Sequence, residues 1–269
     1  MENTNKRPPL TYYGGKQKLL PVILPLIPTH TLYCELFCGG AAVFFGKPPS
    51  DVEVINDTNS ELINFYRVAQ NRFVELNQMI SITLHSRRQH KDAQIVYNNP
   101  HLFDEVKRAW AVWVLSAQSF ASKLDGPFGY DKSSDSTTKR IHNKKESFSE
   151  WIAVRLQHAQ IECADALYIL RSRDTPESFF YADPPYYNSD CGHYDGYTLE
   201  DFEMLLKELA TIKGKFLLSS YPSDVLKKYT KENGWSNRVY EQGVCIATKN
   251  GYQKRKWEVL TANYAFPAE

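Results

Sequence analysis

The chain has 269 residues, of which 42% are hydrophobic and 13% aromatic, and its formal net charge is +1. This length suits one large domain or a domain with an insertion, and the apolar content is sufficient for a buried core. The balanced charge excludes a uniformly basic surface, so any contact with a polyanion has to come from local clusters of basic residues.

The first third of the chain alternates strand-like and helix-like patterns. Residues 31–37 and 52–55 are predicted to be strands, and residues 59–73 have the apolar periodicity of a helix. Between the two strands, the sequence C-G-G-A at 38–41 forms a glycine turn that leads into a helix. This strand–turn–helix–strand order predicts a parallel α/β sheet.

The middle and the end of the chain have different patterns. Residues from about 75 to 118 are predicted to be mainly helical, with Trp110, Trp113 and Leu115 in the core, and the polar segment 125–149 is predicted to be a loop. After residue 151 we expect a helix at 199–210 and strands at 161–163, 179–182, 215–219, 239–248 and 256–262. The last two strands are predicted to be antiparallel. The simplest organisation is an α/β domain interrupted by a helical insertion.

The sequence D-P-P-Y, Asp183 to Tyr186, directly follows a short apolar and aromatic run. The strand ends there because Pro184 has no amide hydrogen and Pro185 holds it in extended geometry. The Asp183 carboxylate and the Pro184 carbonyl can both accept hydrogen bonds from one exocyclic amino group, and Tyr186 or Tyr187 can stack on its ring. Such acceptors stabilise the positive charge that develops when the amine attacks an alkyl donor.

A second group of residues indicates a cofactor. The turn at Gly39 and Gly40 lets backbone approach a ligand, but it is neither a G-x-G-x-x-G fingerprint nor a P-loop. Asp57, at the end of the next strand, stands where a Rossmann-like sheet has an acid for ribose hydroxyls. The alternatives are a structural turn and, for Asp57, the N-cap of the following helix. Together the residues predict a nucleoside-bearing cofactor without a pyrophosphate.

Four ordered motifs resemble the Dam-type, D12 class adenine-N6 DNA methyltransferases. They are Y-Y-G-G-K at 12–16, E-L-F-C-G-G at 35–40, N-D at 56–57 and D-P-P-Y at 183–186, and W-E-V-L-T-A-N-Y at 257–264 is similar to the family's final strand. The resemblance implies a Rossmann-like methyltransferase sheet in two parts, 1–70 and 151–269, with a mainly helical target-recognition insertion at 71–150. It also implies site-specific methylation of adenine N6 in DNA by S-adenosyl-L-methionine.

The resemblance assigns roles to individual residues. The implied cofactor-binding residues are Tyr12, Lys16, Phe37, Gly39, Gly40, Asp57, Asp165 and Asp183. The implied catalytic residues are Asp183, Pro184, Pro185 and Tyr186. Asp57 would bind the ribose, Tyr12 and Lys16 would flank the methionine end, and Asp165 would mark the adenine pocket. An ordinary surface acid at Asp165 and a solvated lysine at Lys16 are the alternatives.

Two segments depart from the family's pattern. The cofactor motif often ends F-x-G-x-G, whereas this chain has Ala41 at the last position. In the insertion, F-A-S-K at 120–123 stands where many relatives have Asn-Gly and a DNA-contacting arginine, and D-G-P-F-G-Y at 125–130 keeps only part of the hairpin that follows. The recognition sequence therefore cannot be transferred from the family.

The expected substrate is duplex DNA, whose paired and stacked adenine has to be flipped out. The basic residues expected on phosphates are Arg87, Arg88, Lys91, Lys139, Arg140, Lys144 and Lys145, with a further cluster at 254–256. Each cluster could instead be a solvated face. The loop 188–197 is predicted to be either a lid over the flipped base or a plain connection.

Other features limit the cellular setting. The five cysteines include no C-x-x-C pair, and no histidine cluster has zinc spacing, so we expect reduced thiols and no metal. The sequence shows neither a signal peptide nor a membrane span. We expect a cytoplasmic monomer or weak homodimer without an endonuclease motif, so a restriction partner would be separate. The alternative functions are a cytosine-N4 or RNA adenine methyltransferase and a catalytically silent DNA-binding relative.

Overall fold

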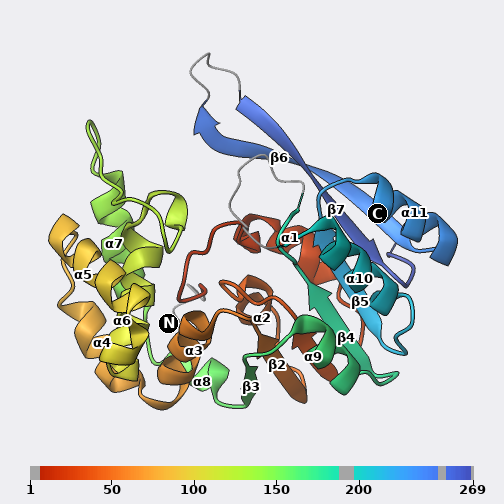
Figure 1. Cartoon of the computed structure of the whole chain (residues 1–269), viewed down its shortest axis with the longest axis horizontal. Helices are drawn as coiled ribbons and strands as arrows, with labels where there is room; N and C mark the ends of the chain where they lie inside the picture. The colour runs from red at the N-terminus through yellow and green to blue at the C-terminus, as the bar shows by residue number, and fades with distance from the viewer. Residues whose placement is uncertain (1–6, 188–196, 248–252, 268–269) are drawn as a thin grey trace. The chain divides into compact units, whose positions relative to one another are not determined.

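The computed structural model describes residues 7–187, 197–247 and 253–267, with only the backbone at 242–247 and 253–256. The strands in these residues are β1 (Leu32–Glu35), β2 (Val52–Asn56), β3 (Ala159–Glu162), β4 (Ser178–Ala182), β5 (Lys215–Ser220), β6 (Ser236–Ala247) and β7 (Gln253–Ala262). They form one mixed sheet in the order β3-β2-β1-β4-β5-β7-β6 (Figure 1), which confirms the predicted α/β class.

The chain divides into two compact units. The first unit consists of Met1–Leu24 and Cys38–Ala164, and the second consists of Pro25–Phe37 and Asp165–Glu269. Short helical turns in the described residues are η1 (Lys16–Leu19), α1 (Leu20–Ile23), η2 (Leu24–Leu26), η3 (Pro100–Leu102) and η4 (Phe120–Ser122). None of these turns was predicted, because each is too short for a periodic pattern to be visible.

In the first unit, β2 and β3 are parallel neighbours in the register Glu53↔Ala159. α2 (Ala42–Gly46) follows the glycine turn and α3 (Ser60–Asn71) follows β2, which confirms the predicted order of elements. α3 begins where the side-chain oxygen of Asn59 accepts hydrogen bonds from two backbone amides of the first helical turn.

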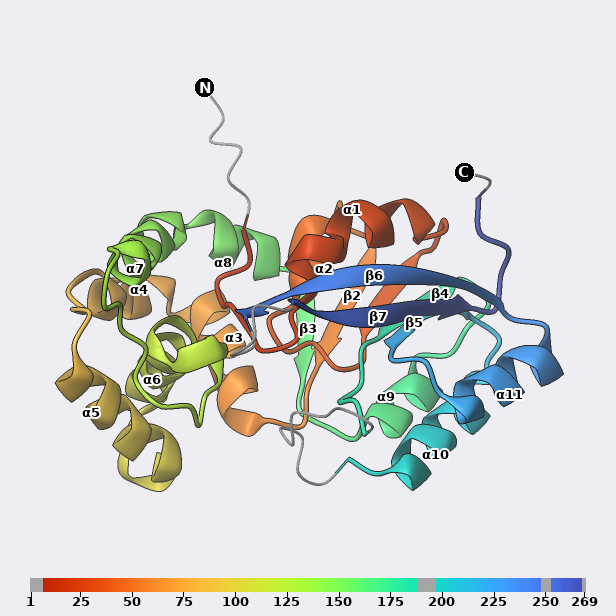
Figure 2. The same ribbon diagram turned by 90° about the horizontal axis from the view of Figure 1, so that it is seen from above.

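The region predicted to be helical, about 75–118, forms α4 (Phe73–Ser81), α5 (Arg87–Asn98) and α6 (Glu105–Gln118). These helices and α7 (Ser136–Ser147) lie together in Figures 1 and 2. α6 is buried over most of its length, including the predicted core residues Trp110, Trp113 and Leu115. Because α6 packs on α3 as well as on α5, these helices belong to the first unit. The role of 71–150 as a target-recognition domain stays a prediction.

α7 shows that the loop predicted over 125–149 was wrong. The Asp131 carboxylate accepts hydrogen bonds from the Thr137 amide and from the hydroxyl groups of Ser136 and Thr137, which fixes the start of the helix. Thr137 and Ile141 are the buried residues of α7. A helix with so small an apolar face has almost no hydrophobic periodicity, so no pattern in this segment indicated a helix.

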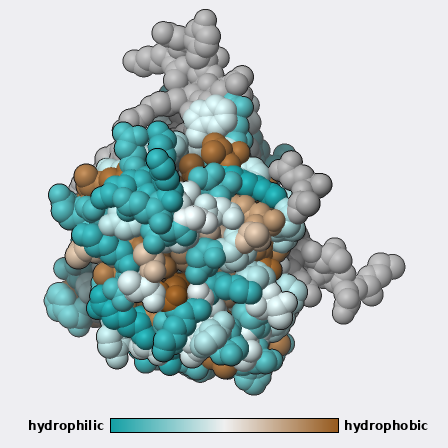
Figure 3. All heavy atoms as spheres, turned by 90° about the vertical axis from the view of Figure 1, so that its right-hand side faces the viewer, coloured by the Kyte–Doolittle hydropathy of each residue, from teal (hydrophilic) through white to brown (hydrophobic). Residues whose placement is uncertain are grey.

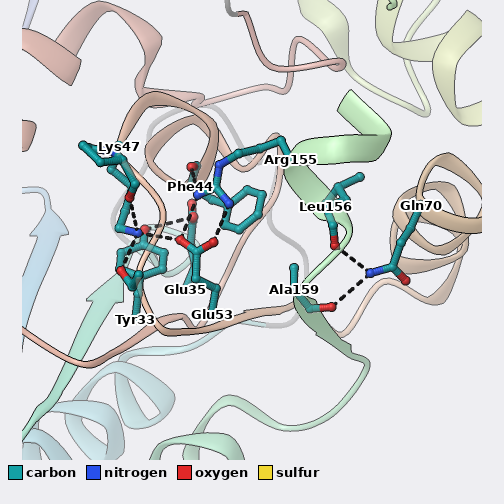
Figure 4. A network of polar contacts seen from close by, with 11 residues as sticks. Tyr33, Glu35, Phe44, Lys47, Glu53, Gln70, Arg155, Leu156 and Ala159 are labelled. Atoms are coloured by element: carbon teal, nitrogen blue, oxygen red, sulfur yellow. Dashed lines mark hydrogen bonds and ion pairs between the residues drawn. The ribbon is translucent and has the colours of Figure 1, made fainter. Parts of the chain in front are cut away.

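A buried ionic cluster ties β2 to α2 and to α8 (Trp151–Leu156) in the first unit (Figure 4). Glu53 accepts hydrogen bonds from Lys47 Nζ at 2.6 Å and from both terminal nitrogens of Arg155, one of them at 2.8 Å. The Arg155 guanidinium also lies 3.7 Å from the centre of the Phe44 ring. Burial opposes ionisation of Glu53, but Arg155 and Lys47 together outweigh it and lower the pKa of Glu53.

In the second unit, β1, β4 and β5 are parallel, and β7 pairs antiparallel with both β5 and β6, as predicted for the last two strands. The helices are α9 (Ala166–Ser172), α10 (Leu199–Leu209) and α11 (Asp224–Asn233), and they lie along one side of these strands (Figure 2). α10 begins with a capping box between Thr198 and Asp201, close to the predicted start. Parallel β1, β4 and β5 bring their carboxyl ends to one edge of the sheet.

The surface on the side of α10 and α11 is mainly hydrophilic, with small, separate hydrophobic spots (Figure 3). Isolated exposed apolar side chains are normal in folded proteins. Within the described ranges, no helix is both long enough and apolar enough to cross a membrane. The same residues include no group of three or more His, Cys, Asp or Glu that could hold a metal ion.

Candidate active site

The glycine turn of the first unit is covered by Tyr12. Gly39 has φ of +46°, a left-handed conformation that glycine adopts without strain. A Cβ on Gly39 would lie 3.0 Å from Tyr12 Cδ1, and one on Gly40 would lie 3.0 Å from Tyr12 Cβ. Two of the predicted cofactor segments are therefore in contact, and a side chain at either glycine would crowd Tyr12.

Asp57 holds the same turn from another side. Its Oδ2 accepts a hydrogen bond from the Gly39 amide at 3.0 Å, and its Oδ1 accepts one from the Asn59 amide at 3.0 Å. The Tyr66 hydroxyl donates to the Gly39 carbonyl at 2.7 Å, so hydrogen bonds hold both the amide and the carbonyl group of Gly39. Asn59, not Asp57, is the N-cap of α3, so the alternative interpretation of Asp57 as that cap was wrong.

The environment of Asp57 suits a ligand with a hydroxyl group. Burial raises the pKa of Asp57, although hydrogen bonds from the amides of Asn59 and Gly39 lower it in part. A carboxylate has about four acceptor positions, and the amides of Asn59, Gly39 and Thr58 use most of them. The remaining capacity allows a hydrogen bond from a ligand hydroxyl group.

Ala41, the position that departs from the family's F-x-G-x-G motif, has an unusual backbone conformation. Its φ and ψ are 50° and 39°, in the left-handed region, and its side chain is fully buried. This conformation costs a non-glycine residue about 1–2 kcal/mol. Glycine would adopt this turn without that cost, whereas in this chain the alanine adopts it at some cost.

Lys16 is a buried residue of η1. Its ammonium group donates to the Gly14 carbonyl at 3.1 Å, and 6% of the residue is exposed. The alternative of an ordinary solvated lysine was therefore wrong. The predicted role of Lys16 at the methionine end of a cofactor stays a prediction.

The second unit contains the remaining predicted cofactor residues. Asp165 is exposed and caps α9, with its Oδ1 accepting from the Tyr168 amide at 3.0 Å. The half-buried Phe37 ring lies edge-on to Tyr197, with 6.3 Å between ring centres. The pKa of Tyr197 is raised, mainly by burial and further by the charges of Asp201 and Asp165. Phe37 and Asp165 therefore both neighbour Tyr197, which the sequence analysis had placed only in a loop.

The D-P-P-Y segment leaves the sheet at the carboxyl end of β4, as predicted. β4 pairs in parallel with β1 and β5, and Asp183 is the next residue of the chain. The Tyr186 hydroxyl oxygen lies 3.1 Å from Asp183 Oδ1, and the centre of the Tyr186 ring lies 4.3 Å from that of Tyr221. Asp183 and Tyr186 are therefore held together, while Pro184 is buried beneath them.

Glu258 was not among the predicted site residues, yet it contacts this loop. Glu258 on β7 accepts hydrogen bonds from the hydroxyl groups of Tyr186 and of Ser219 on β5. Burial, followed by the charges of Asp183 and Glu258, raises the pKa of Tyr186 well above its ordinary value. One signal was available, because Glu258 is an acid inside an otherwise buried strand pattern.

A family model of the D12 class N6 adenine-specific DNA methyltransferases matches residues 12–244. The chain belongs to this family. It is 30% identical to the type II methyltransferase M1.LlaDCHI of Lactococcus lactis subsp. cremoris, over 97% of this chain and 96% of that protein. It is 28% identical to the modification methylase StsI of Streptococcus sanguinis, over 70% of this chain and 30% of that protein. It is 23% identical to the type II methyltransferase M.FokI of Planomicrobium okeanokoites, over 72% of this chain and 31% of that protein.

As a D12 class enzyme, the chain is an adenine-specific DNA methyltransferase that requires a methyl donor. Its basic residues are then of interest as DNA contacts. Arg87 stacks over Phe128 and Tyr130, at 4.9 and 5.2 Å from the ring centres. Arg88 pairs with Asp92 at 3.1 Å, and Lys91 is exposed on the same helix, α5.

The second predicted basic cluster, on α7, divides into two pairs. Lys139 and Arg140 are exposed. Lys144 turns its ammonium group to the Ser116 carbonyl at 3.3 Å, and burial lowers its pKa to about 7. Lys145 donates to the Ser81 carbonyl at 3.1 Å. Lys144 and Lys145 therefore fasten α7 to other helices of the first unit, which the sequence analysis did not foresee.

Two further predictions fall outside the described residues. The predicted lid at 188–197 is described only at Tyr197, and the side chains of the basic cluster at 254–256 are not described. Both predictions stand as they were made.

Proposed function

We propose that this enzyme transfers a methyl group from S-adenosyl-L-methionine to N6 of an adenine that is flipped out of duplex DNA. The observation that carries the proposal is the pair Asp183 and Tyr186, held in contact directly after β4 in a chain of the D12 class. The naming of relatives as type II methyltransferases and modification methylases further supports a role in protecting DNA from a separate restriction enzyme.

The cofactor proposal rests on how the chain's own groups fit it. Bound S-adenosyl-L-methionine supplies an electrophilic methyl carbon on a sulfonium. In the first unit, Asp57 offers carboxylate oxygens for the ribose, and Gly39 and Gly40 give a backbone turn without side chains. In the same unit Tyr12 covers this turn, and Lys16 is assigned with it to the methionine end. In the second unit Asp165 is assigned to the adenine pocket, and Phe37 and Asp183 are further proposed cofactor residues.

The catalytic proposal is electrostatic. Asp183 and the Pro184 carbonyl accept hydrogen bonds from the target amino group, which directs the nitrogen lone pair toward the methyl carbon. As the N–C bond forms, the bond between the methyl carbon and the sulfonium sulfur would break, and its electron pair would stay on sulfur, which leaves as a neutral thioether. Positive charge develops on nitrogen, and the Asp183 carboxylate stabilises it. The nitrogen then releases one of its hydrogens as a proton to water. Pro185 keeps the loop stiff, and Tyr186 or Tyr187 provides a stacking face for the flipped base.

The proposed DNA contacts are the exposed basic residues of α5 and α7. Arg87, Arg88 and Lys91 lie at the start of α5, and Lys139 and Arg140 lie on α7. His85 joins these regions, because its Nδ1 lies 3.0 Å from the Thr138 hydroxyl oxygen. Lys144 and Lys145 are assigned a structural role instead, since their ammonium groups bind backbone carbonyls. We propose a monomer or weak dimer as the active form.

The decisive experiment is transfer of a labelled methyl group from S-adenosyl-L-methionine to unmethylated DNA, with Asp183→Ala as the matched variant. Nucleoside analysis of the product should show N6-methyladenine with the wild-type enzyme and none with the variant. Label on cytosine N4 would refute the adenine assignment. Absence of transfer, with DNA and donor both bound, would favour a catalytically silent DNA-binding protein.

A further inference from the structure

Glu258 is a buried acid that contacts the catalytic loop. It lies on β7, between β5 and β6, and 4% of the residue is exposed. A buried carboxylate is costly unless several donors satisfy it. An apolar residue at this position of the sheet would not carry the free-energy cost of burying a carboxylate. We therefore expect Glu258 to have a role other than packing.

The partners of Glu258 indicate that role. Its Oε1 accepts hydrogen bonds from the Ser219 hydroxyl, on the neighbouring strand, and from the Tyr186 hydroxyl, on the catalytic loop. Tyr186 is 72 residues away in the chain. A hydrogen bond to a buried charged group is among the stronger ones in proteins, so it fixes the Tyr186 side chain firmly.

The hydrogens of this cluster have to be shared. A phenol carries one hydrogen, yet the Tyr186 hydroxyl faces two carboxylate oxygens, Asp183 Oδ1 at 3.1 Å and Glu258 Oε1. When the hydrogen is directed to Glu258, the Asp183 oxygen keeps its lone pairs for another donor. The raised pKa of Tyr186 means that the hydroxyl retains this hydrogen.

We propose that Glu258 is a positioning residue for methyl transfer. It holds the Tyr186 hydroxyl, and it thereby keeps the aromatic ring in place and leaves Asp183 to accept from the target amine. The inference rests on the proposed function, because it concerns the same reaction. It adds to that function a residue near the end of the chain that touches neither the amine nor the donor.

The test is a double-mutant cycle with Glu258→Gln, Tyr186→Phe and the double variant of the full chain. Single-turnover methyl transfer to DNA is measured together with the dissociation constants for S-adenosyl-L-methionine and DNA and the thermal midpoint. In the wild-type background, Glu258→Gln should lower the transfer rate about 10- to 100-fold with both dissociation constants unchanged. In the Tyr186→Phe background, the same replacement should change the rate less than about twofold.

Two results would overturn the inference. One is a Glu258→Gln rate within about twofold of the wild type, and the other is an equal loss with and without the Tyr186 hydroxyl. Glu258→Asp keeps the carboxylate but shortens the side chain, so it should slow transfer as Glu258→Gln does. If the glutamine variant does not fold, Glu258→Asp replaces it in the cycle. Ser219→Ala removes the Ser219 hydroxyl from both Glu258 and Tyr186 but keeps the hydrogen bond between Glu258 and Tyr186, so it should slow transfer less than Glu258→Gln does. A wild-type enzyme that transfers no methyl group would refute the proposed function itself.

Discussion

Replacement of Asp57 by asparagine should separate cofactor binding from folding stability. Asp57 accepts two backbone hydrogen bonds, and asparagine retains one acceptor oxygen for them. Loss of one charge-assisted hydrogen bond costs about 1.5–3 kcal/mol. However, burial raises the pKa of Asp57 in spite of its amide donors, so the ionised form is itself a burden on the folded state. The two effects oppose each other, and we expect the free energy of unfolding to change by about 1 kcal/mol or less.

The same replacement should strongly weaken binding of the methyl donor, S-adenosyl-L-methionine. Asparagine offers a ribose hydroxyl a neutral amide instead of a carboxylate, so at least one charge-assisted hydrogen bond is lost. At about 1.5–3 kcal/mol, this loss corresponds to a dissociation constant about 10- to 100-fold higher. Calorimetric titration with S-adenosyl-L-methionine and urea unfolding, both at pH 7.5, measure the two quantities.

The direction of the pH effect provides a second check. Because the pKa of Asp57 is raised in the folded protein, its contribution favours folding at pH values below the unfolded pKa and is lost as the pH rises through the folded pKa. Asp57→Asn removes that dependence. Asp51→Asn, at an exposed position before β2, removes the same formal charge and should change neither quantity. A large loss of stability with unchanged donor affinity would show that Asp57 serves only to hold the turn.

Further predictions concern the first unit. Glu53→Gln should lower the free energy of unfolding by about 3–5 kcal/mol in urea titrations, since it removes the carboxylate charge that faces two buried cations. Because the pKa of Glu53 is lowered, its stabilisation is present at neutral pH and is lost as the pH falls through the folded pKa, so the variant should show less loss of stability in acid. The double replacement Lys139→Ala and Arg140→Ala should weaken DNA binding and reduce the salt slope by about 2, whereas Lys144→Ala should lower the melting temperature and leave the slope unchanged. Equal salt slopes for the two variants would refute the assignment of α7 as a phosphate-binding helix.

The predictable parts of this protein are those whose causes are local. The D-P-P-Y segment ends β4 through the properties of proline itself, and the glycine turn follows from two small residues between strand patterns. The strands of the second unit were found because apolar runs between turn residues are typical of buried parallel strands. Each of these features is determined within about ten residues of sequence.

The features that could not be predicted depend on distant partners. α7 was missed because Asp131 and two lysines, rather than an apolar face, hold it in place. Glu258 was not predicted as a site residue because its role depends on a hydrogen bond with Tyr186, which is distant in the sequence. The left-handed backbone of Ala41 was also invisible, since alanine gives no sign of such a conformation.

The anchoring of α7 has a consequence for protein engineering. On the prediction that 71–150 recognises the target sequence, the polar segment 125–149 is a natural piece to exchange between D12 enzymes. In this chain, however, Lys144 and Lys145 fasten that segment to carbonyl groups of Ser116 and Ser81. A graft that lacks these lysines loses its attachment to the host, so hybrid enzymes should exchange Ser81 to Ser147 as one piece.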